Sequence, residues 1–140
     1  LMIGGESQII EKVRPILIKH KVKFIVNDSS IIAKNVKADG CHIGQMDEKI
    51  SKVKKILKNK IIGVTCHNSK ILALQAIKGK ANYIAFGSFY ISQLKPRAKK
   101  ANFNVLRWAK KIEFEHDEKN LDKYLEMMKK RQAFKNVQLV

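Results

Sequence analysis

Two aspartates in the sequence stand just beyond short apolar segments. Asp28 follows the apolar residues 24–26 and Asn27, and Asp47 follows the apolar residues 41–43 within four positions. An aspartate just before a helix commonly caps it by accepting a hydrogen bond from a backbone N–H group. Two carboxylates that meet at one edge of a sheet can instead hold Mg²⁺ together with substrate phosphates. The pattern leaves both explanations open, helix capping and a shared metal site.

The segments that must position these acids alternate between short apolar runs and amphipathic runs. Strand-like runs lie at residues 23–27, 41–44, 61–65 and 83–87. Helix-like runs lie at about 6–20, from Ser29 or Ser30 to 37, at 48–58, and at 69–79. The strand-like runs recur roughly every twenty residues with a helix in each gap, which predicts a buried parallel sheet and an α/β fold. Pro15 is expected to weaken or kink the first helix.

The predicted sheet collects several polar residues at one edge. All strands of a parallel sheet have their carboxyl ends on the same edge, where ligands of α/β folds bind. The residues at or just after the ends of the four strands there are Asn27, Asp28, Gln45, Asp47, Thr65, Cys66, His67, Asn68, Gly87 and Ser88. Asp28 and Asp47 come from adjacent strands and are the candidates for ligating one Mg²⁺ ion, with capping as the alternative for each. Asp39 lies in a turn at the opposite edge, so we expect it to be structural.

Other residues in these segments have structural explanations that need no ligand. We expect Ser69 to cap the helix that it precedes and His42 to be a hydrogen-bonded core residue. His67 lies in the third exit loop, where it could assist phosphate binding. Cys41 and Cys66 lie within apolar runs and lack CxxC spacing, so we expect two buried free thiols and no zinc site.

The strongly basic charge of the chain is carried mainly by lysine. The 140 residues include 29 Lys and Arg against 12 Asp and Glu, a formal net charge of +17. The arginines are Arg14, Arg97, Arg107 and Arg131. Because the guanidinium fork that recognises phosphate and guanine is scarce, we expect a solvated lysine surface and no specific nucleic-acid partner. No apolar run reaches the roughly 20 residues of a membrane span, and free thiols favour a cytoplasmic location.

Four stretches resemble the thiamine-phosphate synthase family in their order and spacing. They read FIVND, ADGCHIGQMD, IIGVTCHN and NYIAFGSFYISQLK, and the resemblance covers about residues 20–111. It implies a TIM (β/α)8 barrel. The implied reaction joins 4-amino-2-methylpyrimidine-5-ylmethyl diphosphate to a thiazole phosphate, giving thiamine phosphate and pyrophosphate with Mg²⁺ as cofactor. The thiazole nitrogen is then the nucleophile, which agrees with the absence of a GxSxG motif from the chain.

The same resemblance assigns a role to six residues of this sequence. It implies that Asn27 contacts the pyrimidine substrate and that Asp28 and Asp47 ligate Mg²⁺. Thr65 stands where the family usually has a serine that binds the diphosphate. The family usually reads P-T-x-T-K after the fourth strand, and this chain has residues 91–95 there. Lys95 matches the diphosphate-binding, catalytic lysine, Ser92 stands in for the first threonine, and Leu94 removes the second hydroxyl.

The chain also departs from the family pattern in two places. It has about four strands, and the early strand with a Q-x-R-x-K diphosphate clamp is not present. After Lys111 the family continues into a Gly-Gly-Ile phosphate cradle, whereas this sequence continues into an amphipathic run with Leu121, Tyr124, Leu125 and Met128. We therefore expect a partial barrel domain at residues 1–111 and a divergent helical segment at 112–140.

Three functional hypotheses follow. The first is a thiamine-phosphate synthase that keeps the metal and diphosphate half of the site. The second is a thiazole tautomerase-like isomerase of the same fold, which would have no need of Mg²⁺ or of the Asp28 and Asp47 pair. The third is an inactive truncated barrel that acts only in binding or assembly. In each case open sheet edges favour a homo-oligomer.

Overall fold

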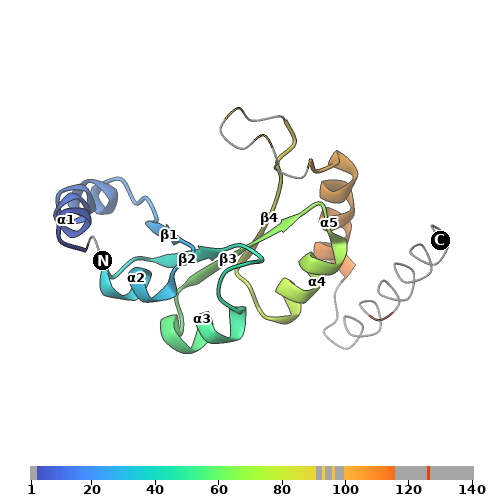
Figure 1. Cartoon of the computed structure of the whole chain (residues 1–140). Helices are drawn as coiled ribbons and strands as arrows, with labels where there is room; N and C mark the ends of the chain where they lie inside the picture. The colour runs from blue at the N-terminus through green and yellow to red at the C-terminus, as the bar shows by residue number, and fades with distance from the viewer. Residues whose placement is uncertain (1–2, 91–92, 94–95, 97–99, 116–125, 127–140) are drawn as a thin grey trace. The chain divides into compact units, whose positions relative to one another are not determined.

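The structure is a computed structural model and describes residues 3–90, 93, 96, 100–115 and 126. Five helices and four strands follow one another in the order α1, β1, α2, β2, α3, β3, α4, β4 and α5 within this described part. The strands are hydrogen-bonded in the order β1–β2–β3–β4 and form an open sheet (Figure 1). The chain divides into two compact units, residues 1–63 and 64–140, and the division falls inside β3.

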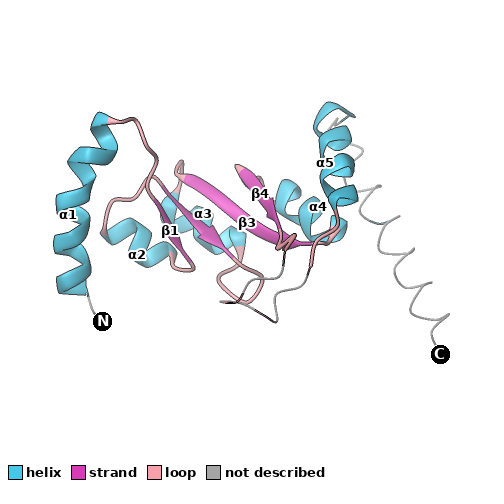
Figure 2. Cartoon of the chain, turned by 90° about the horizontal axis from the view of Figure 1, so that it is seen from above, coloured by secondary structure: helices cyan, strands magenta, loops and turns pink. Residues whose placement is uncertain are grey.

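The first unit contains the parallel strand pair that carries the two candidate metal ligands. Its elements are α1 (Ile3–Lys19), β1 (Ile25–Asn27), α2 (Ser30–Asn35), β2 (Gly40–Ile43), α3 (Ile50–Leu57) and the first residues of β3 (Ile61–His67). Strands β1 and β2 pair in parallel, with Ile25 opposite Gly40 and Asn27 opposite His42. Helix α2 packs on both strands and α3 packs on β2, so both helices cover the same face of this pair (Figure 2).

The second unit contains the rest of β3 together with α4 (Lys70–Lys78), β4 (Tyr83–Phe86) and α5 (Phe103–Glu115). Helix α4 packs on β4. Leu74 of α4 is buried against Ile112 of α5, and Ile71, Ile77 and Trp108 pack around this contact. Helix α5 therefore continues beyond residue 111, and the expected domain boundary after that residue stays a prediction.

Two helices begin in the same way, directly after a strand. Asp28 and His67 have positive φ angles of 69° and 50°. The serines that follow shortly afterwards cap the next helix. The Oγ of Ser29 accepts a hydrogen bond from Ile32 N at 3.3 Å, and the Oγ of Ser69 accepts one from Leu72 N at 3.2 Å. The predicted capping role of Ser69 is confirmed, and a positive φ at the strand end is what turns each chain toward its helix.

The predicted elements are confirmed in type and order, and several boundaries differ. Helix α1 begins earlier than expected and contains Pro15 in its interior. Strand β2 begins and ends one residue earlier than expected, at Gly40 and Ile43. Strand β3 extends to His67, two residues beyond the expected end at Thr65, so Cys66 and His67 lie within the strand and not in the exit loop. The predicted parallel α/β class is confirmed, and the described sheet is open. That these strands belong to an incomplete TIM barrel stays a prediction.

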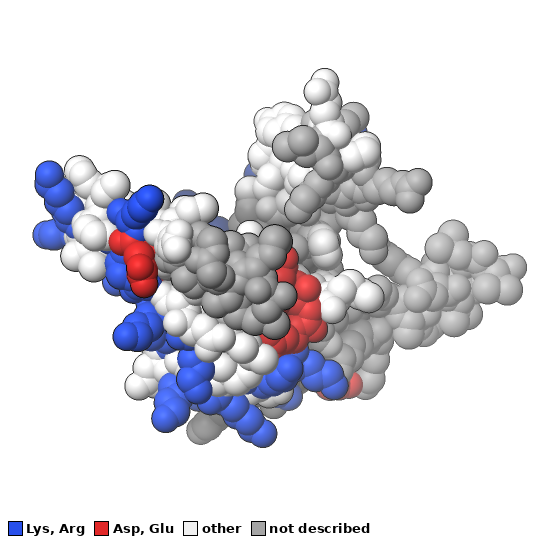
Figure 3. Space-filling view, turned by 60° about the vertical axis from the view of Figure 1, so that its left-hand side comes forward, with Lys and Arg blue, Asp and Glu red and all other residues white. Residues whose placement is uncertain are grey.

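The lysine-rich surface can be seen in the structure, whereas the predicted C-terminal helix falls mostly on residues that are not described. Lysine and arginine side chains lie mainly over the left and lower part of the face seen in Figure 3, and the acidic side chains form smaller patches there. The amphipathic run at 121–128 lies almost entirely outside the described residues, so its helical structure stays a prediction. Within the part of the chain that is described, no helix combines the length and apolar character needed to cross a membrane.

Candidate functional site

Asp28 lies at the carboxyl end of β1, where the chain leaves the sheet. Its backbone N–H donates to His42 O at 2.8 Å, one residue beyond the paired Asn27 and His42. The left-handed backbone of Asp28, at φ 69°, is a conformation that Asp and Asn adopt more readily than other residues that carry a Cβ. Asn27 and Asp28 are both exposed. The structure thus places these two predicted site residues side by side at the expected edge of the sheet.

Asp47 lies in the loop after β2 and closes that loop on itself. Its Oδ2 accepts a hydrogen bond from Gly44 N at 2.6 Å. A Cβ built on Gly44 would lie 2.9 Å from the same oxygen, so the absence of a side chain permits this close approach. The carboxylate of Asp47 is exposed and held at the carboxyl end of β2, next to the end of β1.

The capping alternative for the two aspartates is wrong. The N-cap of α2 is Ser29, whose hydroxyl makes the capping hydrogen bond. The N-cap of α3 is Lys49, which makes no side-chain capping bond. Asp28 and Asp47 each precede the cap residue by one or two positions, so neither occupies the N-cap position that the capping explanation required.

Glu48 is part of this edge and was not singled out from the sequence. Its Oε1 accepts from Ser30 N at 2.9 Å, and its Oε2 accepts from Ser30 Oγ at 2.7 Å. Lys52 forms an ion pair with it at 3.4 Å. Burial by itself raises the pKa of Glu48, but the two hydrogen bonds from Ser30 and the charge of Lys52 outweigh it and lower the pKa below its ordinary value of 4.5. The sequence shows only the spacing of Glu48 and Lys52, because Ser30 lies 18 residues away.

The thiol of Cys41, in β2, is affected by burial and by the charges of three carboxylates. Burial, followed by the charges of Glu48, Asp28 and Asp47, raises the pKa of the Cys41 thiol from 9.0 to about 11. Burial alone raises the pKa of Cys66 to about 11. Both cysteines are free and buried, as predicted. Both thiols are therefore protonated at neutral pH, so neither is an activated nucleophile.

The donor set at this edge fits a magnesium ion that also binds substrate. Among the described residues, no three His, Cys, Asp or Glu side chains form a cluster that could hold a metal. Mg²⁺ is usually bound by one or two carboxylates and completes its octahedron with water and substrate phosphates. Asp28 and Asp47 supply this number of carboxylates from two adjacent parallel strands.

The carboxyl ends of β3 and β4, in the second unit, are held together by backbone contacts. Gly87 N donates to His67 O at 3.1 Å, and Ala101 N donates to Ser88 O at 2.7 Å. Asn68 Oδ1 accepts from Asn102 N at 2.9 Å, which fixes the segment that enters α5. These bonds join the β3 and β4 exits to the start of α5.

Of the other residues predicted to bind substrate, Thr65 is described by the structure, and Ser92 and Lys95 are not. Thr65 lies inside β3, where it is half-buried, two residues before the strand ends. Ser92 and Lys95 lie outside the described residues, so their diphosphate contacts remain predictions. His67 ends β3 and does not lie in a loop, which corrects the position expected for it.

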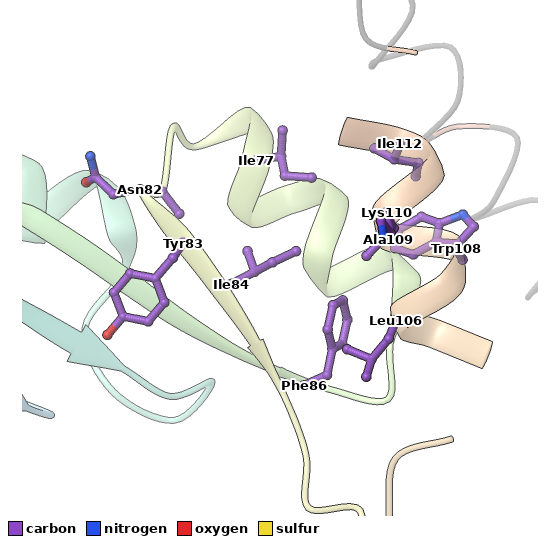
Figure 4. Close-up of a pocket in the computed structure, with 11 residues that line it drawn as sticks. Ile77, Asn82, Tyr83, Ile84, Phe86, Leu106, Trp108, Ala109, Lys110 and Ile112 are labelled. Atoms are coloured by element: carbon purple, nitrogen blue, oxygen red, sulfur yellow. The ribbon is translucent and has the colours of Figure 1, made fainter. Parts of the chain in front are cut away.

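An apolar groove in the second unit contains none of the predicted site residues. Its volume is about 540 Å³, and β4, α4 and α5 form its walls (Figure 4). Ile84 and Phe86 of β4, Ile77 of α4 and Trp108 of α5 line it. Figure 4 shows Ile84 and Phe86 directed toward the two helices and Tyr83 directed away from them. The apolar lining suits protein packing better than the binding of a diphosphate.

Comparison with known proteins gives the family. The family model described as thiamine monophosphate synthase matches residues 6–113. The chain belongs to this family. The match confirms the resemblance carried by the strand-exit motifs, and it extends that resemblance to include most of α1. The thiamine monophosphate synthase family acts in thiamine biosynthesis.

Individual members of the thiamine monophosphate synthase family show how much of the chain is shared. The thiamine-phosphate synthase of Pelagibacter ubique is 53% identical over 102 residues, covering 73% of this chain and 49% of the relative. That of Erythrobacter litoralis is 39% identical over 105 residues, with the same two coverages of 73% and 49%. A solved thiamine phosphate pyrophosphorylase from Pyrococcus furiosus is similar in structure, with a TM-score of 0.64 and 30% identity, covering 73% of this chain and 48% of that one. The chain spans about half the length of these relatives.

Proposed function

We propose that this chain carries the metal-binding and diphosphate-binding half of a thiamine-phosphate synthase. The reaction joins 4-amino-2-methylpyrimidine-5-ylmethyl diphosphate to a thiazole phosphate and releases pyrophosphate. One observation supports the proposal within this family: Asp28 and Asp47 follow adjacent parallel strands at the same edge of the sheet. Neither acid is used as a helix cap.

The proposed mechanism is electrostatic and needs no protein nucleophile. The bond between the pyrimidine methylene carbon and the diphosphate oxygen breaks, and pyrophosphate leaves with the electron pair. The thiazole nitrogen supplies the pair for the new carbon–nitrogen bond. When bound, Mg²⁺ neutralises charge on the leaving diphosphate, a contribution of several kcal/mol to the barrier.

Each predicted residue has a defined task in this mechanism. Asp28 and Asp47 hold the cation, and Asn27 orients the pyrimidine by hydrogen bonding. Thr65 and Ser92 donate hydroxyl hydrogen bonds to the diphosphate. The ammonium group of Lys95 binds the leaving oxygens and offsets the negative charge that develops on them.

An assay of the purified chain with both substrates and Mg²⁺ separates the three hypotheses. Release of pyrophosphate that stops when the cation is chelated supports the synthase. Isomerisation of the thiazole substrate without added metal supports the tautomerase-like alternative instead. If neither reaction occurs, the proposed activity of this chain is wrong, and the result supports the hypothesis of a binding or assembly role.

We also propose that the chain self-associates through its open sheet edge and the adjoining groove. The described sheet ends at β1 and β4, and edge strands offer unpaired backbone groups to another chain. The apolar groove of about 540 Å³ runs along one face of β4. Sedimentation is therefore expected to show concentration-dependent oligomers, and a stable monomer at every concentration would contradict this proposal.

A pair of matched variants locates the contact. Leu106 lines the groove and Ile32 lies on α2 in the other unit, and both side chains are 40% exposed. Leu106→Glu is expected to shift sedimentation toward the monomer because it places a charge in the groove. Ile32→Glu introduces the same charge elsewhere and is expected to leave the oligomers unchanged.

A further inference from the structure

We propose that Glu48 is a positioning residue that holds the two metal-binding loops at a fixed separation. The inference rests on the proposed function, since it concerns the distance between the carboxylates of Asp28 and Asp47. Ser30 follows Asp28 by two positions, and Glu48 follows Asp47 directly. The two hydrogen bonds between Glu48 and Ser30 therefore connect the loop after β1 to the loop after β2.

The geometry of this contact suits a rigid connection. Both carboxylate oxygens of Glu48 are engaged by one residue, at 2.9 Å to Ser30 N and 2.7 Å to Ser30 Oγ. Ser30 is fully buried and the Glu48 side chain is 16% exposed, so competition from water is limited. Hydrogen bonds to an ionised carboxylate are roughly twice as strong as those between neutral groups.

The contact does more than begin a helix. Helix α2 already has its own cap, since the Ser29 hydroxyl accepts from Ile32 N. The backbone bond from Asp28 N to His42 O joins the two segments where they leave the sheet. Glu48 joins them a second time, beyond Asp28 on one side and beyond Asp47 on the other. Two connections flank the candidate cation site, and together they limit how far its ligands can separate.

Partners that orient metal ligands affect metal binding without touching the ion. Changing such residues typically lowers metal affinity or activity by about 10- to 100-fold. We therefore expect Glu48→Ala to weaken binding of Mn²⁺, used as a spectroscopic stand-in for Mg²⁺, by about tenfold. The loss follows from freer motion of the Asp28 and Asp47 loops relative to each other.

A conservative variant distinguishes positioning from a simple effect of charge. Glu48→Gln removes the negative charge, but its amide oxygen can accept from Ser30 N and its amide nitrogen can donate to Ser30 Oγ. If Glu48 acts by position, Glu48→Gln retains Mn²⁺ affinity close to that of the unaltered chain. Ser30→Ala changes no charge and is expected to reproduce part of the loss. Lys52→Gln removes the ion pair, keeps both Ser30 bonds and serves as the matched control.

The experiment measures Mn²⁺ binding to the full chain by calorimetry, together with the broadening of backbone amide signals that Mn²⁺ causes. In the unaltered chain, amides near Asp28 and near Gly44 are expected to broaden together. Glu48→Ala is expected to uncouple them, so that one loop broadens at Mn²⁺ concentrations that leave the other sharp. Circular dichroism checks that each variant is folded, and Ser30→Ala tests the same connection if Glu48→Ala fails to fold.

The outcomes separate this inference from the proposed function. If Asp28→Asn and Asp47→Asn abolish Mn²⁺ binding while Glu48→Ala and Ser30→Ala leave it unchanged, the metal site stands and the positioning role is overturned. Equal losses in Glu48→Gln and Glu48→Ala also overturn it, because charge alone would then explain the effect. If the unaltered chain binds no Mn²⁺, or binds it equally well without both aspartates, the metal site itself is wrong.

Discussion

Asp28→Asn is expected to abolish pyrophosphate release and to leave the stability of the fold nearly unchanged. The carboxylate is exposed, and the backbone at φ 69° suits Asn as well as Asp, so the substitution introduces no strain. Loss of one of two metal ligands removes several kcal/mol of charge stabilisation, and each 1.36 kcal/mol is tenfold in rate. We therefore expect kcat to fall by about 100-fold or more, measured as pyrophosphate release at saturating Mg²⁺.

The choice of asparagine matters, because alanine would confound the result. A residue such as Ala in the left-handed region costs roughly 1–2 kcal/mol, so Asp28→Ala would change stability and activity together. Asp39→Asn is the matched control. Asp39 Oδ2 accepts a hydrogen bond from Phe24 N at 2.8 Å. Asp39 lies just before β2, at the opposite edge of the sheet from Asp28. Normal activity in Asp28→Asn would show that this carboxylate does not hold the catalytic cation.

Gly40→Val is expected to destabilise the first unit severely. A Cβ at Gly40 would lie 2.2 Å from Ile61 O and 2.7 Å from Ile61 Cβ, so the start of β3 would have to move away from β2. Overpacking in a well-packed core typically costs about 1–3 kcal/mol, and here the conflict involves backbone atoms that cannot rotate away. Urea unfolding followed by circular dichroism should show a lower midpoint that corresponds to a loss of at least about 1–3 kcal/mol in the free energy of unfolding, or no cooperative transition.

Gly79→Ala is the control for this substitution. Gly79 caps the end of α4 at φ −70° and ψ 0°, a conformation open to any residue. Its replacement by alanine is expected to be neutral or mildly stabilising, since it lowers the entropy of the unfolded chain. If Gly40→Val were as stable as Gly79→Ala, the start of β3 would not lie as close to Gly40 as the structure places it.

The part of the candidate site that the sequence predicted is the part that follows from local pattern. The βα repeat determines that Asp28 and Asp47 leave adjacent strands at one edge, because parallel strands connected by helices must all point the same way. The capping role of Ser69 was also predictable, since it depends on a hydrogen bond to a residue three positions away. The buried state of Cys41 and Cys66 followed from the apolar runs around them.

Two features of the site were predicted wrongly, one for a local reason and one because of a residue that is distant in sequence. The capping explanation for Asp28 and Asp47 was wrong because Ser29 and Lys49, one or two positions later, are the residues that begin the helices. The position expected for His67 was wrong because β3 continues two residues beyond Thr65, where Gly87 N binds His67 O. Pairing with a neighbouring strand determines where a strand ends, and the amino-acid pattern of a short segment does not predict that pairing.

The sequence by itself determined the class of the fold, the order of the elements from α1 to β4, and the edge at which the two aspartates emerge. These properties depend on the spacing of apolar residues and on hydrogen bonds that span a few positions, so they can be read from short segments. The tertiary structure alone decided that Glu48 binds Ser30 and that Gly40 lies against Ile61. Each of these contacts joins residues about twenty positions apart, and only packing of the folded chain brings such residues together.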